Sequence, residues 1–333
     1  MERGSQGISV AEEGKNQAMR LLVTGGAGFI GSNFVPYILG KYADYEAVNL
    51  DALTYAGRLD NLAEVKNNPR YKFVQGRIED GKLVDKLMKD VDVMINFAAE
   101  SHVDRSILEP QVFITTNVLG TQILLDAALR HKVKLFYQIS TDEVYGALKL
   151  GTRENFTEES PLRPNSPYSA SKTSADLLVR AYYHTYDLPV VISRCSNNYG
   201  PKQHPEKFIP TVILNALNDK PVPIYGDGLY VRDWINVIDH CHAIDLIMHK
   251  GKPGEIYNVG ADNEWANIDL AKKILQILGK PESLLTSVKD RPGHDRRYAI
   301  DSAKLRRELG WKPMIPFDEG IAQTIRHYSG AGK

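Results

Sequence analysis

The stretch Gly25-Gly26-Ala27-Gly28-Phe29-Ile30-Gly31 decides the fold, because it lies between an apolar run at 20–24 and an amphipathic segment at 29–42. Its first glycine permits a tight turn, a later one lets backbone amides approach a pyrophosphate, and the last lets a helix pack on a strand. The N-terminus of that helix would offer unpaired N–H groups and a partial positive charge to the phosphates. The stretch therefore predicts a dinucleotide site at the first strand-to-helix junction of a Rossmann-type sheet.

Asp51 strengthens this prediction, because it ends the next apolar run at 46–51. An acidic residue at that place accepts hydrogen bonds from a ribose and repels a 2′-phosphate. A glycine-rich turn alone could be an ordinary tight turn. With Asp51 in place, the sequence favours NAD over NADP as the cofactor.

Beyond this junction, short apolar runs alternate with amphipathic segments as far as Arg194. Strands alternating with helices are typical of a doubly wound parallel sheet with right-handed crossovers. The predicted fold class is therefore α/β, a Rossmann-type doubly wound parallel sheet with a smaller C-terminal substrate-binding lobe. We expect strands at 20–25, 46–51, 71–76, 91–99, 134–140 and 189–194, and helices at 29–42, 112–132 and 167–186.

After Arg194 the chain becomes rich in proline, glycine and asparagine, which build loops and pockets more often than cores. Short helices and strands are expected at 255–260, 268–279 and 302–311. The predicted domains are a disordered N-terminal extension or tag (1–18), an NAD-binding domain (19–193, with a possible return of 237–259) and a mainly substrate-binding lobe (194–333).

The composition argues against several classes of function. The 333-residue chain has a formal net charge of zero, which gives no support for binding nucleic acid or membranes through bulk charge. Its two cysteines, Cys195 and Cys241, lack metal-ligand spacing, so no metal site is expected. There is no run of about 18 apolar residues, and the N-terminus lacks the apolar core of a signal peptide. We therefore expect a cytoplasmic protein.

Tyr168 and Lys172 form a Tyr-x-x-x-Lys motif, which places both side chains on one face of a helix. A phenol has a pKa of about 10 and is a poor base at neutral pH. A nearby ammonium group, together with a positive nicotinamide, would favour the phenolate and lower that pKa. The spacing is common by chance on solvated helices. Beside a cofactor turn, it predicts a base that takes a proton from a sugar hydroxyl as hydride leaves the same carbon.

Thr141, Asp142 and Glu143 follow the strand expected at 134–140. Ligands of doubly wound sheets bind at the carboxyl ends of the strands. Adjacent carboxyl groups tend to have separated pKa values, so one can be an acid while the other is a base. An Asp-Glu pair is often only a helix cap or part of a solvated loop, but its place at this edge favours catalysis. Thr141 would hydrogen-bond a substrate hydroxyl.

Several segments together resemble the extended short-chain dehydrogenase/reductase family, and the resemblance covers the chain from Met19 to about Tyr328. Within that family the chain is most similar to the dTDP-glucose 4,6-dehydratases, since sugar-nucleotide epimerases usually have small or hydroxyl residues in place of Asp142 and Glu143. The segments are TGGAGFIG (24–31), AAESHVDRS (98–106), ISTDEVYG (139–146), SPYSASK (166–172), SNNYGP (196–201) and DRPGHDRRYAID (290–301).

The resemblance implies an NAD-dependent hydro-lyase of deoxysugar biosynthesis, of the rhamnose type, with three stages of reaction. Tyr168, supported by Lys172, would remove the C4 hydroxyl proton while the C4 hydride passes to NAD. Glu143 would then remove the C5 proton, and Asp142 would protonate the departing C6 hydroxyl. Return of the hydride to C6 would give a 4-keto-6-deoxy sugar nucleotide and regenerate NAD within one turnover.

The resemblance also implies binding residues for both ligands. Arginine suits the diphosphate because its fixed fork of donors matches phosphate oxygens. The residues implied for NAD are Gly25, Gly28, Phe29, Ile30, Gly31, Asp51, Leu53, Thr54, Ile78, Ala98, Ala99, Ser101, Thr116, Tyr168, Lys172 and Asn198. The residues implied for dTDP-glucose are Ser101, Thr141, Asn197, Lys207, Phe208, Pro223, Tyr225, Arg232, Asn267, Asp290, Arg291 and His294.

Two features depart from the family pattern. The family usually has an Asp-Ile pair after the third strand, whose acid meets the adenine amino group, and here the segment is Gly76-Arg77-Ile78. Because Arg77 cannot accept that bond, the adenine contact would rest on the Ile78 backbone or differ. The chain also ends soon after Tyr328, whereas longer relatives extend further, so a C-terminal substrate contact would be missing or replaced.

Other functions remain open from the sequence. The pair Asp142–Glu143 argues against a 4-epimerase or decarboxylase, since those reactions need no acid–base pair at C5 and C6. Intact Thr141, Tyr168 and Lys172 argue against a non-enzymatic NAD-binding protein. Another nucleotide is possible, because thymidine rests on the resemblance of the second lobe. The resemblance further implies a homodimer, formed through helices at 111–132 and 169–186.

Overall fold

A parallel seven-stranded sheet forms the centre of the computed structural model, which describes residues 18–330. The strands lie in the order β10-β6-β5-β4-β1-β2-β3, and neighbouring strands are parallel throughout. The predicted fold class is confirmed, while the predicted N-terminal extension lies outside the described residues apart from Ala18. The strands are β1 (Met19–Thr24), β2 (Tyr45–Asp51), β3 (Tyr71–Gln75), β4 (Val93–Asn96), β5 (Leu135–Thr141), β6 (Val190–Cys195) and β10 (Ile256–Val259).

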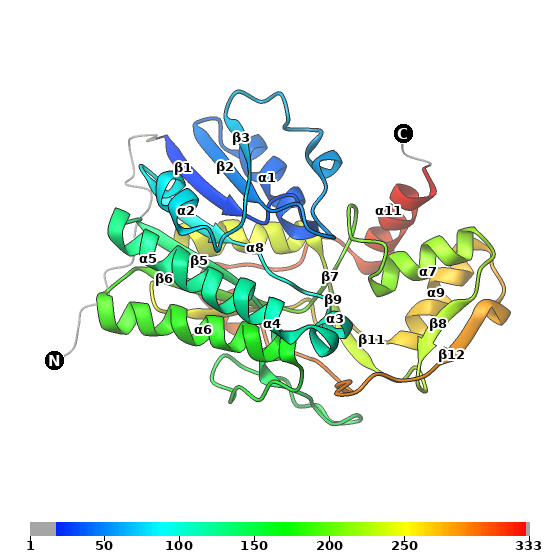
Figure 1. Cartoon of the computed structure of the whole chain (residues 1–333). Coiled ribbons are helices and arrows are strands. Elements are labelled where there is room, and N and C mark those ends of the chain that lie inside the picture. The colour runs from blue at the N-terminus through cyan, green and yellow to red at the C-terminus, as the bar shows by residue number, and fades with distance from the viewer. Residues whose placement is uncertain (1–17, 331–333) are drawn as a thin grey trace.

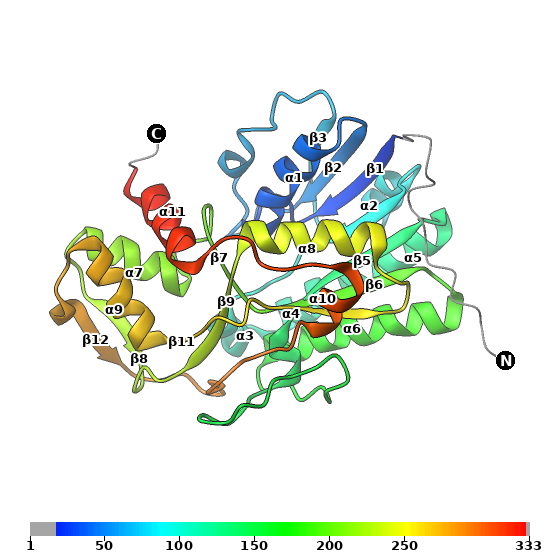
Figure 2. The ribbon, with the colours of Figure 1, turned by 180° about the vertical axis from the view of Figure 1, so that it is seen from behind.

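Helices cover both faces of this sheet, as Figures 1 and 2 show from opposite sides. α1 (Phe29–Lys41) and α8 (Val237–Lys250) pack on one face. α2 (Gly81–Met88), α5 (Thr121–His131) and α6 (Pro167–Tyr186) pack on the other. Because both faces are covered, β5 and β6 are buried along their whole length, which is why their first residues, 135–137 and 190–192, are apolar rather than alternating.

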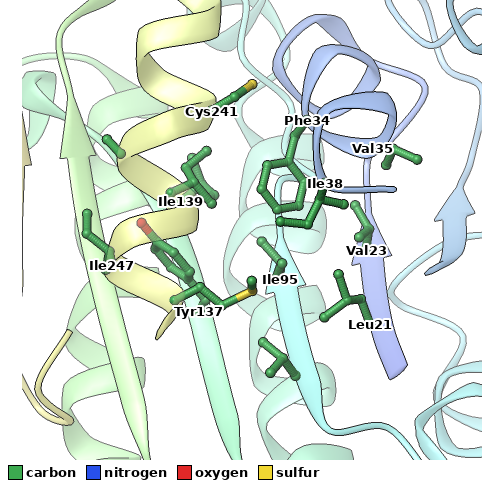
Figure 3. Close-up of a cluster of buried hydrophobic side chains, with 14 of the residues drawn as sticks. Leu21, Val23, Phe34, Val35, Ile38, Ile95, Tyr137, Ile139, Cys241 and Ile247 are labelled. Atoms are coloured by element: carbon green, nitrogen blue, oxygen red, sulfur yellow. The ribbon is translucent and has the colours of Figure 1, made fainter. Parts of the chain in front are cut away.

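Figure 3 shows the core between the sheet and the first helical layer. Phe34 and Ile38 of α1 point toward Ile95 of β4 and Ile139 of β5, and all four are almost fully buried. Burial of such side chains stabilises the fold by about 1.5–3 kcal/mol each. This core fixes α1 against the sheet and so positions the glycine turn that precedes it.

The helix predicted at 112–132 is present, but its first half is not regular α-helix. α4 (Pro110–Phe113) leads into a π-helical turn, η2 (Ile114–Gly120), which continues into α5. A Cβ atom at Gly120 would lie 2.6 Å from the Ile78 side chain, so only glycine permits this close approach to the segment after β3. π-Helical turns occur often at functional sites.

One helical run in residues 18–330, Pro110–His131, is long and apolar enough to cross a membrane by length and composition alone. Within the fold it packs beside α6, and 44% of its most apolar window is buried. Helices in the core of a protein pass the same test.

Residues after β6 build most of a second lobe, which lies beyond the carboxyl ends of the parallel strands (Figure 1). The core of this lobe is formed mainly by α7 (Phe208–Leu217), α9 (Asn267–Leu278) and α11 (Phe317–Ser329). The segment 237–259 returns to the main sheet as α8 and β10. The remaining elements are η1 (Leu59–Leu62), α3 (Val103–Leu108), η3 (Asp142–Tyr145), β7 (Asn197–Tyr199), α7 (Phe208–Leu217), β8 (Val222–Tyr225), β9 (Val231–Asn236), β11 (Glu264–Ala266), α9 (Asn267–Leu278), η4 (Glu282–Leu284), β12 (Leu285–Val288), α10 (Ala303–Leu309) and α11 (Phe317–Ser329).

Candidate functional site

A cleft runs along the carboxyl ends of β1, β2, β4, β5 and β6, the edge at which doubly wound sheets bind ligands. All the residues predicted to face NAD line it except Leu53, whose side chain packs against the core. The residues predicted to face the sugar nucleotide that also line it are Ser101, Thr141, Asn197 and Lys207.

The turn after β1 lies too close to its neighbours to accept side chains. Gly25 has a φ of +70°, and a Cβ atom there would lie 2.6 Å from the backbone nitrogen of Ala98. A Cβ atom at Gly31 would lie 2.6 Å from the carbonyl oxygen of Gly25. α1 begins after this turn without a side-chain cap, so its first N–H groups remain available for an anion. This cradle fits the pyrophosphate of a dinucleotide.

Asp51 holds the same turn from the end of β2. Its Oδ2 atom accepts a hydrogen bond from the backbone N–H of Ala27 (2.8 Å), and Oδ1 accepts one from Leu53 (2.8 Å). Burial raises the pKa of Asp51, while these two hydrogen bonds act in the opposite direction. Each carboxylate oxygen has a second lone pair, which suits the hydroxyl groups of an adenosine ribose.

Tyr168 and Lys172 lie one turn apart on α6, and both are buried in the wall of the cleft. Lys172 Nζ donates to the carbonyl oxygen of Ile139 (2.8 Å), which fixes the ammonium group beside β5. Burial raises the pKa of Tyr168 well above its ordinary value, and the Glu143 carboxylate adds to the rise. The lowered Tyr168 pKa expected from the sequence requires a positive nicotinamide as well as Lys172, so it stays a prediction.

η3 follows β5 directly and carries two carboxyl groups to the cleft. Thr141 caps it, since its Oγ1 atom accepts a hydrogen bond from the Glu143 N–H (3.3 Å) and donates one to Asp142 Oδ1 (3.3 Å). Burial raises the pKa of Asp142 well above its usual range, and Glu143 adds to the rise. Burial also raises the pKa of Glu143, but nearby cations oppose it. The more strongly raised Asp142 is therefore the group that favours the protonated state.

The cations around Glu143 come from three separate elements. Lys207 precedes α7, Arg232 lies buried on β9, and Arg291 lies in the loop after β12. Arg291 forms an ion pair with Asp104 of α3, with Nη1 3.3 Å from Oδ1. Cations gathered beside two carboxyl groups suit a diphosphate, whose charge they could neutralise.

Tyr225, Asp290 and His294, which were also predicted from the second lobe, lie beside Arg291. The Tyr225 ring meets the His294 ring edge-on at 6.1 Å, and His294 Nδ1 lies 2.8 Å from Asp290 Oδ1. The Asn267 Oδ1 atom is buried and has no hydrogen-bond partner among residues 18–330. Eight of the predicted substrate residues do not line the cleft, and their contacts with substrate stay predictions. They are Phe208, Pro223, Tyr225, Arg232, Asn267, Asp290, Arg291 and His294.

The cleft also contains residues that the sequence analysis missed. Ser140 and Ser196 line it, and the Ser140 hydroxyl group is buried without a hydrogen-bond partner in the part of the chain that the structure describes. Both lie at or just past the carboxyl end of a strand, so the strand-end rule could have found them. Gln203 and His204 also line it, but they come from a loop whose position the sequence does not indicate.

Residues 18–330 contain no group of three or more His, Cys, Asp or Glu side chains that could hold a metal ion. His102 instead caps α3, where its Nδ1 atom accepts the N–H of Arg105 (3.4 Å). Cys195 is buried at the cleft wall, its thiol donates to the Ser140 carbonyl (3.4 Å), and burial raises its pKa to about 12. A thiol of that pKa is inert at neutral pH.

Comparisons with known proteins agree with this geometry. The family model of GDP-mannose 4,6 dehydratase matches residues 22–324. The chain is 53% identical to the low-salt glycan biosynthesis protein Agl12 of Haloferax volcanii, over 94% of this chain and 99% of that protein. It is 52% identical to a dTDP-glucose 4,6-dehydratase of Xanthomonas campestris, over 92% of each chain.

Solved structures that share this fold include enzymes of two different activities. The dTDP-glucose 4,6-dehydratase DesIV of Streptomyces venezuelae, with NAD bound, matches at a TM-score of 0.91 and 50% identity, over 94% of this chain and 97% of that one. A UDP-glucuronic acid 4-epimerase of Bacillus cereus matches at a TM-score of 0.89 but 29% identity, over 94% and 100%. Because the two scores are close, overall shape does not distinguish the activities. Sequence identity does, and with the family model it shows that this chain belongs to the GDP-mannose 4,6 dehydratase family and, within it, to the dTDP-glucose 4,6-dehydratases.

Proposed function

We propose that this protein is an NAD-dependent hydro-lyase that converts dTDP-glucose into dTDP-4-keto-6-deoxyglucose and water. The observation that carries this function is the carboxyl pair Asp142–Glu143 in the same cleft as Tyr168. Epimerisation at C4 needs one base, whereas loss of water across C5 and C6 needs a further acid and base. The cleft supplies all three groups.

Residues along β1, β2 and β4 would hold the cofactor. The turn Gly25–Gly31 would receive the pyrophosphate, Asp51 the adenosine ribose, and Ala98–Ser101 the half that approaches Tyr168. When bound, NAD supplies the oxidant for C4 and the reductant for C6.

Tyr168 would take the proton of the C4 hydroxyl group. Lys172, held by the Ile139 carbonyl, keeps an ammonium group one helical turn away. Because burial opposes ionisation of this phenol, positive charge in the cleft is required to make it a base at neutral pH.

Glu143 and Asp142 would carry out the elimination. A ketone at C4 makes the C5 proton acidic, and Glu143 would accept that proton. Asp142, whose pKa burial raises well above its usual range, would give its proton to the departing C6 hydroxyl. The C5–H and C6–O bonds break, a C5–C6 double bond forms, and one water molecule leaves.

Two other activities are candidates for specific reasons. A 4-epimerase is a candidate because the Bacillus cereus epimerase shares the fold. A 4,6-dehydratase that acts on another nucleotide sugar is a candidate because the family model carries the name GDP-mannose 4,6 dehydratase.

Incubation of the purified protein with dTDP-glucose tests these alternatives. We expect a 4-keto-6-deoxy sugar nucleotide, with no net formation of NADH. Formation of dTDP-galactose without loss of water would establish an epimerase and overturn the proposal. A panel of dTDP-, UDP-, GDP- and CDP-glucose, compared by kcat/KM, would identify the nucleotide.

We also propose that the protein is a homodimer. Apolar side chains of α3, η2 and α6 are exposed on adjoining helices, with Leu108 80%, Ile114 53% and Leu177 53% exposed. A group of exposed apolar side chains marks an interaction surface, and two copies of this face would bury each other in a four-helix contact. Sedimentation equilibrium should give twice the chain mass, and Leu177→Asp should shift the protein toward a single chain.

The division of labour between the two lobes is also a proposal. We assign NAD binding to residues 19–193 with the returning segment 237–259, and nucleotide-sugar binding mainly to the rest of 194–333. The two cysteines are free and buried, which agrees with work in a reducing compartment such as the cytoplasm. A rhamnose-type deoxysugar pathway is the proposed context.

A further inference from the structure

A chain of buried polar groups lies behind the cleft. Arg194 of β6 donates from Nε to Asp176 Oδ2 on α6 (3.0 Å) and from Nη1 to the Tyr145 hydroxyl on η3 (3.0 Å). Tyr145 donates in turn to Asn258 Oδ1 on β10 (2.8 Å). All four side chains belong to residues that are at most 3% exposed. The chain therefore crosses the interior from α6 to η3 and the far edge of the sheet.

Two members of this chain, Asp176 and Tyr145, lie on the two elements that carry the proposed catalytic residues. Asp176 lies one turn beyond Lys172 on the same face of α6. Tyr145 ends η3, which begins with the pair Asp142–Glu143. Arg194 is thus bonded both to the helix used for oxidation at C4 and to the turn used for elimination.

Stability alone gives a weak reason for a charge pair at this depth. Taking two ions out of water costs about as much as their attraction returns, and apolar residues of the same volume often do as well. Asp176 Oδ1 is also buried without a hydrogen-bond partner in residues 18–330, which adds to the cost. Stability therefore does not explain this buried ion pair. A role in fixing the positions of neighbouring groups and in acting on their charge does explain it.

We propose that Asp176, Arg194 and Tyr145 are positioning residues that hold the oxidation pair and the elimination pair at a fixed separation. The proposal rests on the proposed function, since only a reaction with both stages needs both pairs to reach one sugar. Asp176 acts on Lys172, because its carboxylate lies one turn along the same helix face. Tyr145 acts on Asp142 and Glu143, because its hydroxyl group ties the end of η3 to β6 and β10.

The charge states of these groups agree with this role. Burial lowers the Lys172 pKa, and the Asp176 carboxylate opposes that fall, so Asp176 helps to keep the ammonium group charged. Burial raises the pKa of Tyr145 to about 12, so its hydroxyl stays neutral and can accept from Arg194 while donating to Asn258. The Tyr145 ring stacks on Phe156 at 5.1 Å, a contact that phenylalanine at position 145 would keep.

Rapid mixing of the NAD-loaded protein with dTDP-glucose tests the proposal, with the absorbance of the reduced nicotinamide as the signal. The rise of the signal reports oxidation at C4, and its decay reports elimination followed by reduction. Tyr145→Phe should leave the rise unchanged and slow the decay about tenfold, the effect of losing one buried hydrogen bond. Asp176→Asn should slow the rise by about the same factor, so that little reduced nicotinamide builds up.

Matched variants separate positioning from lost stability. Tyr257→Phe removes another buried hydroxyl group, which accepts the N–H of Lys252 (3.1 Å). Asp239→Asn alters a buried carboxylate on α8 that accepts the N–H of Met314 (2.9 Å). Both controls should lower the thermal midpoint but keep the wild-type rise and decay.

A double variant covers the case in which Asp176→Asn does not fold because Arg194 stays charged and unpaired. Asp176→Asn with Arg194→Gln removes both charges together, and it should still slow the rise. The proposal is overturned if folded Tyr145 and Asp176 variants keep both wild-type phases, or if each variant slows both phases equally. If the wild-type protein makes the 4-epimer, both the proposed function and this proposal are wrong. That result is obtained with the wild-type protein, before any variant is made.

Discussion

The two halves of the cleft are built in different ways. In the cofactor half, small residues such as Gly25 and Ala98 approach within contact distance, and a hydrogen bond from the Ala27 N–H to Asp51 fixes the glycine turn. In the substrate half, long cationic side chains such as Lys207 and Arg291 arrive from separate elements. The cofactor half should therefore be sensitive to side-chain size and tolerant of changes in charge. The substrate half should show the opposite behaviour.

Glu143 lies where the two halves meet, and its loss should have the largest effect. Glu143→Gln keeps the size but removes the base, so we expect the elimination rate to fall roughly 10²–10⁴-fold. Oxidation at C4 does not need Glu143, so reduced nicotinamide should accumulate on the protein. Its absorbance after mixing with dTDP-glucose measures this. Glu159→Gln, on an exposed loop, is the control, and unchanged turnover of Glu143→Gln would remove this residue from the mechanism.

The pH dependence of the wild-type protein follows from the same residue. Burial raises the Glu143 pKa, and the base works only when ionised, so turnover should be complete above that pKa and lost as the pH falls through it. The acid limb of the kcat profile should therefore lie at a higher pH than an exposed glutamate would give, and the Glu143→Gln variant should lack this limb. A limb at the pH of an exposed glutamate would contradict the burial argument.

Gly31→Ala tests whether the cofactor half is limited by size. Its Cβ atom would lie 2.6 Å from the Gly25 carbonyl oxygen, so the turn must move, at a cost of about 1–3 kcal/mol. NAD affinity, measured by titration calorimetry, should fall roughly tenfold to a hundredfold. Gly40→Ala is the control on the same helix, where nothing lies within 4 Å of an added Cβ atom. That variant should keep its NAD affinity and gain about 0.5–1 kcal/mol of stability.

The same contrast explains how much could be predicted from the sequence. The cofactor half is encoded by short local motifs at strand ends, so its fold could be predicted, and all but one of the residues predicted for NAD line the cleft. Leu53 is the exception, because its backbone turns through a φ of +51° and sends the side chain into the core. Ser140 and Ser196 were missed although they lie at or just past the carboxyl end of a strand.

The substrate half depends on tertiary packing, which the sequence does not reveal residue by residue. The resemblance predicted that Arg232 and Arg291 bind the substrate. It did not predict that both lie around Glu143. The depth of burial that raises the Tyr168 pKa is also not readable from a four-residue spacing. The two findings have one cause, because both depend on what lies around a side chain rather than on its neighbours in sequence.

Arg291→Ala tests the substrate half for dependence on charge. Loss of a hydrogen bond to a charged group costs about 1.5–3 kcal/mol, so KM for dTDP-glucose should rise roughly tenfold to a hundredfold. The Glu143 pKa should also rise, because Arg291 lowers it, and the acid limb of kcat should move to higher pH. Arg296→Ala is the control, since its guanidinium is already held by Asp227 (2.8 Å). A KM that changes equally in both variants would show that Arg291 acts only through bulk charge.

Arg77 gives the smallest expected effect and the sharpest test of tolerance to charge in the cofactor half. It lines the cleft at the end where adenine is expected, is exposed, and its guanidinium forms no hydrogen bond or ion pair within residues 18–330. An exposed charge of this kind contributes about 0.2–1 kcal/mol. Arg77→Ala should therefore change NAD affinity by less than about fivefold, and added salt should erase the difference.

Arg77→Asp extends the test, because it places an acceptor where the family usually has one for the adenine amino group. It should tighten NAD binding slightly and weaken NADP binding, since Asp51 and the new carboxylate would both repel a 2′-phosphate. Titration with each cofactor at low and high salt measures both effects. If Arg77→Ala instead weakened NAD binding tenfold or more at all salt concentrations, the guanidinium would be a direct contact. The cofactor half would then depend on charge as the substrate half does, and the contrast between them would fail.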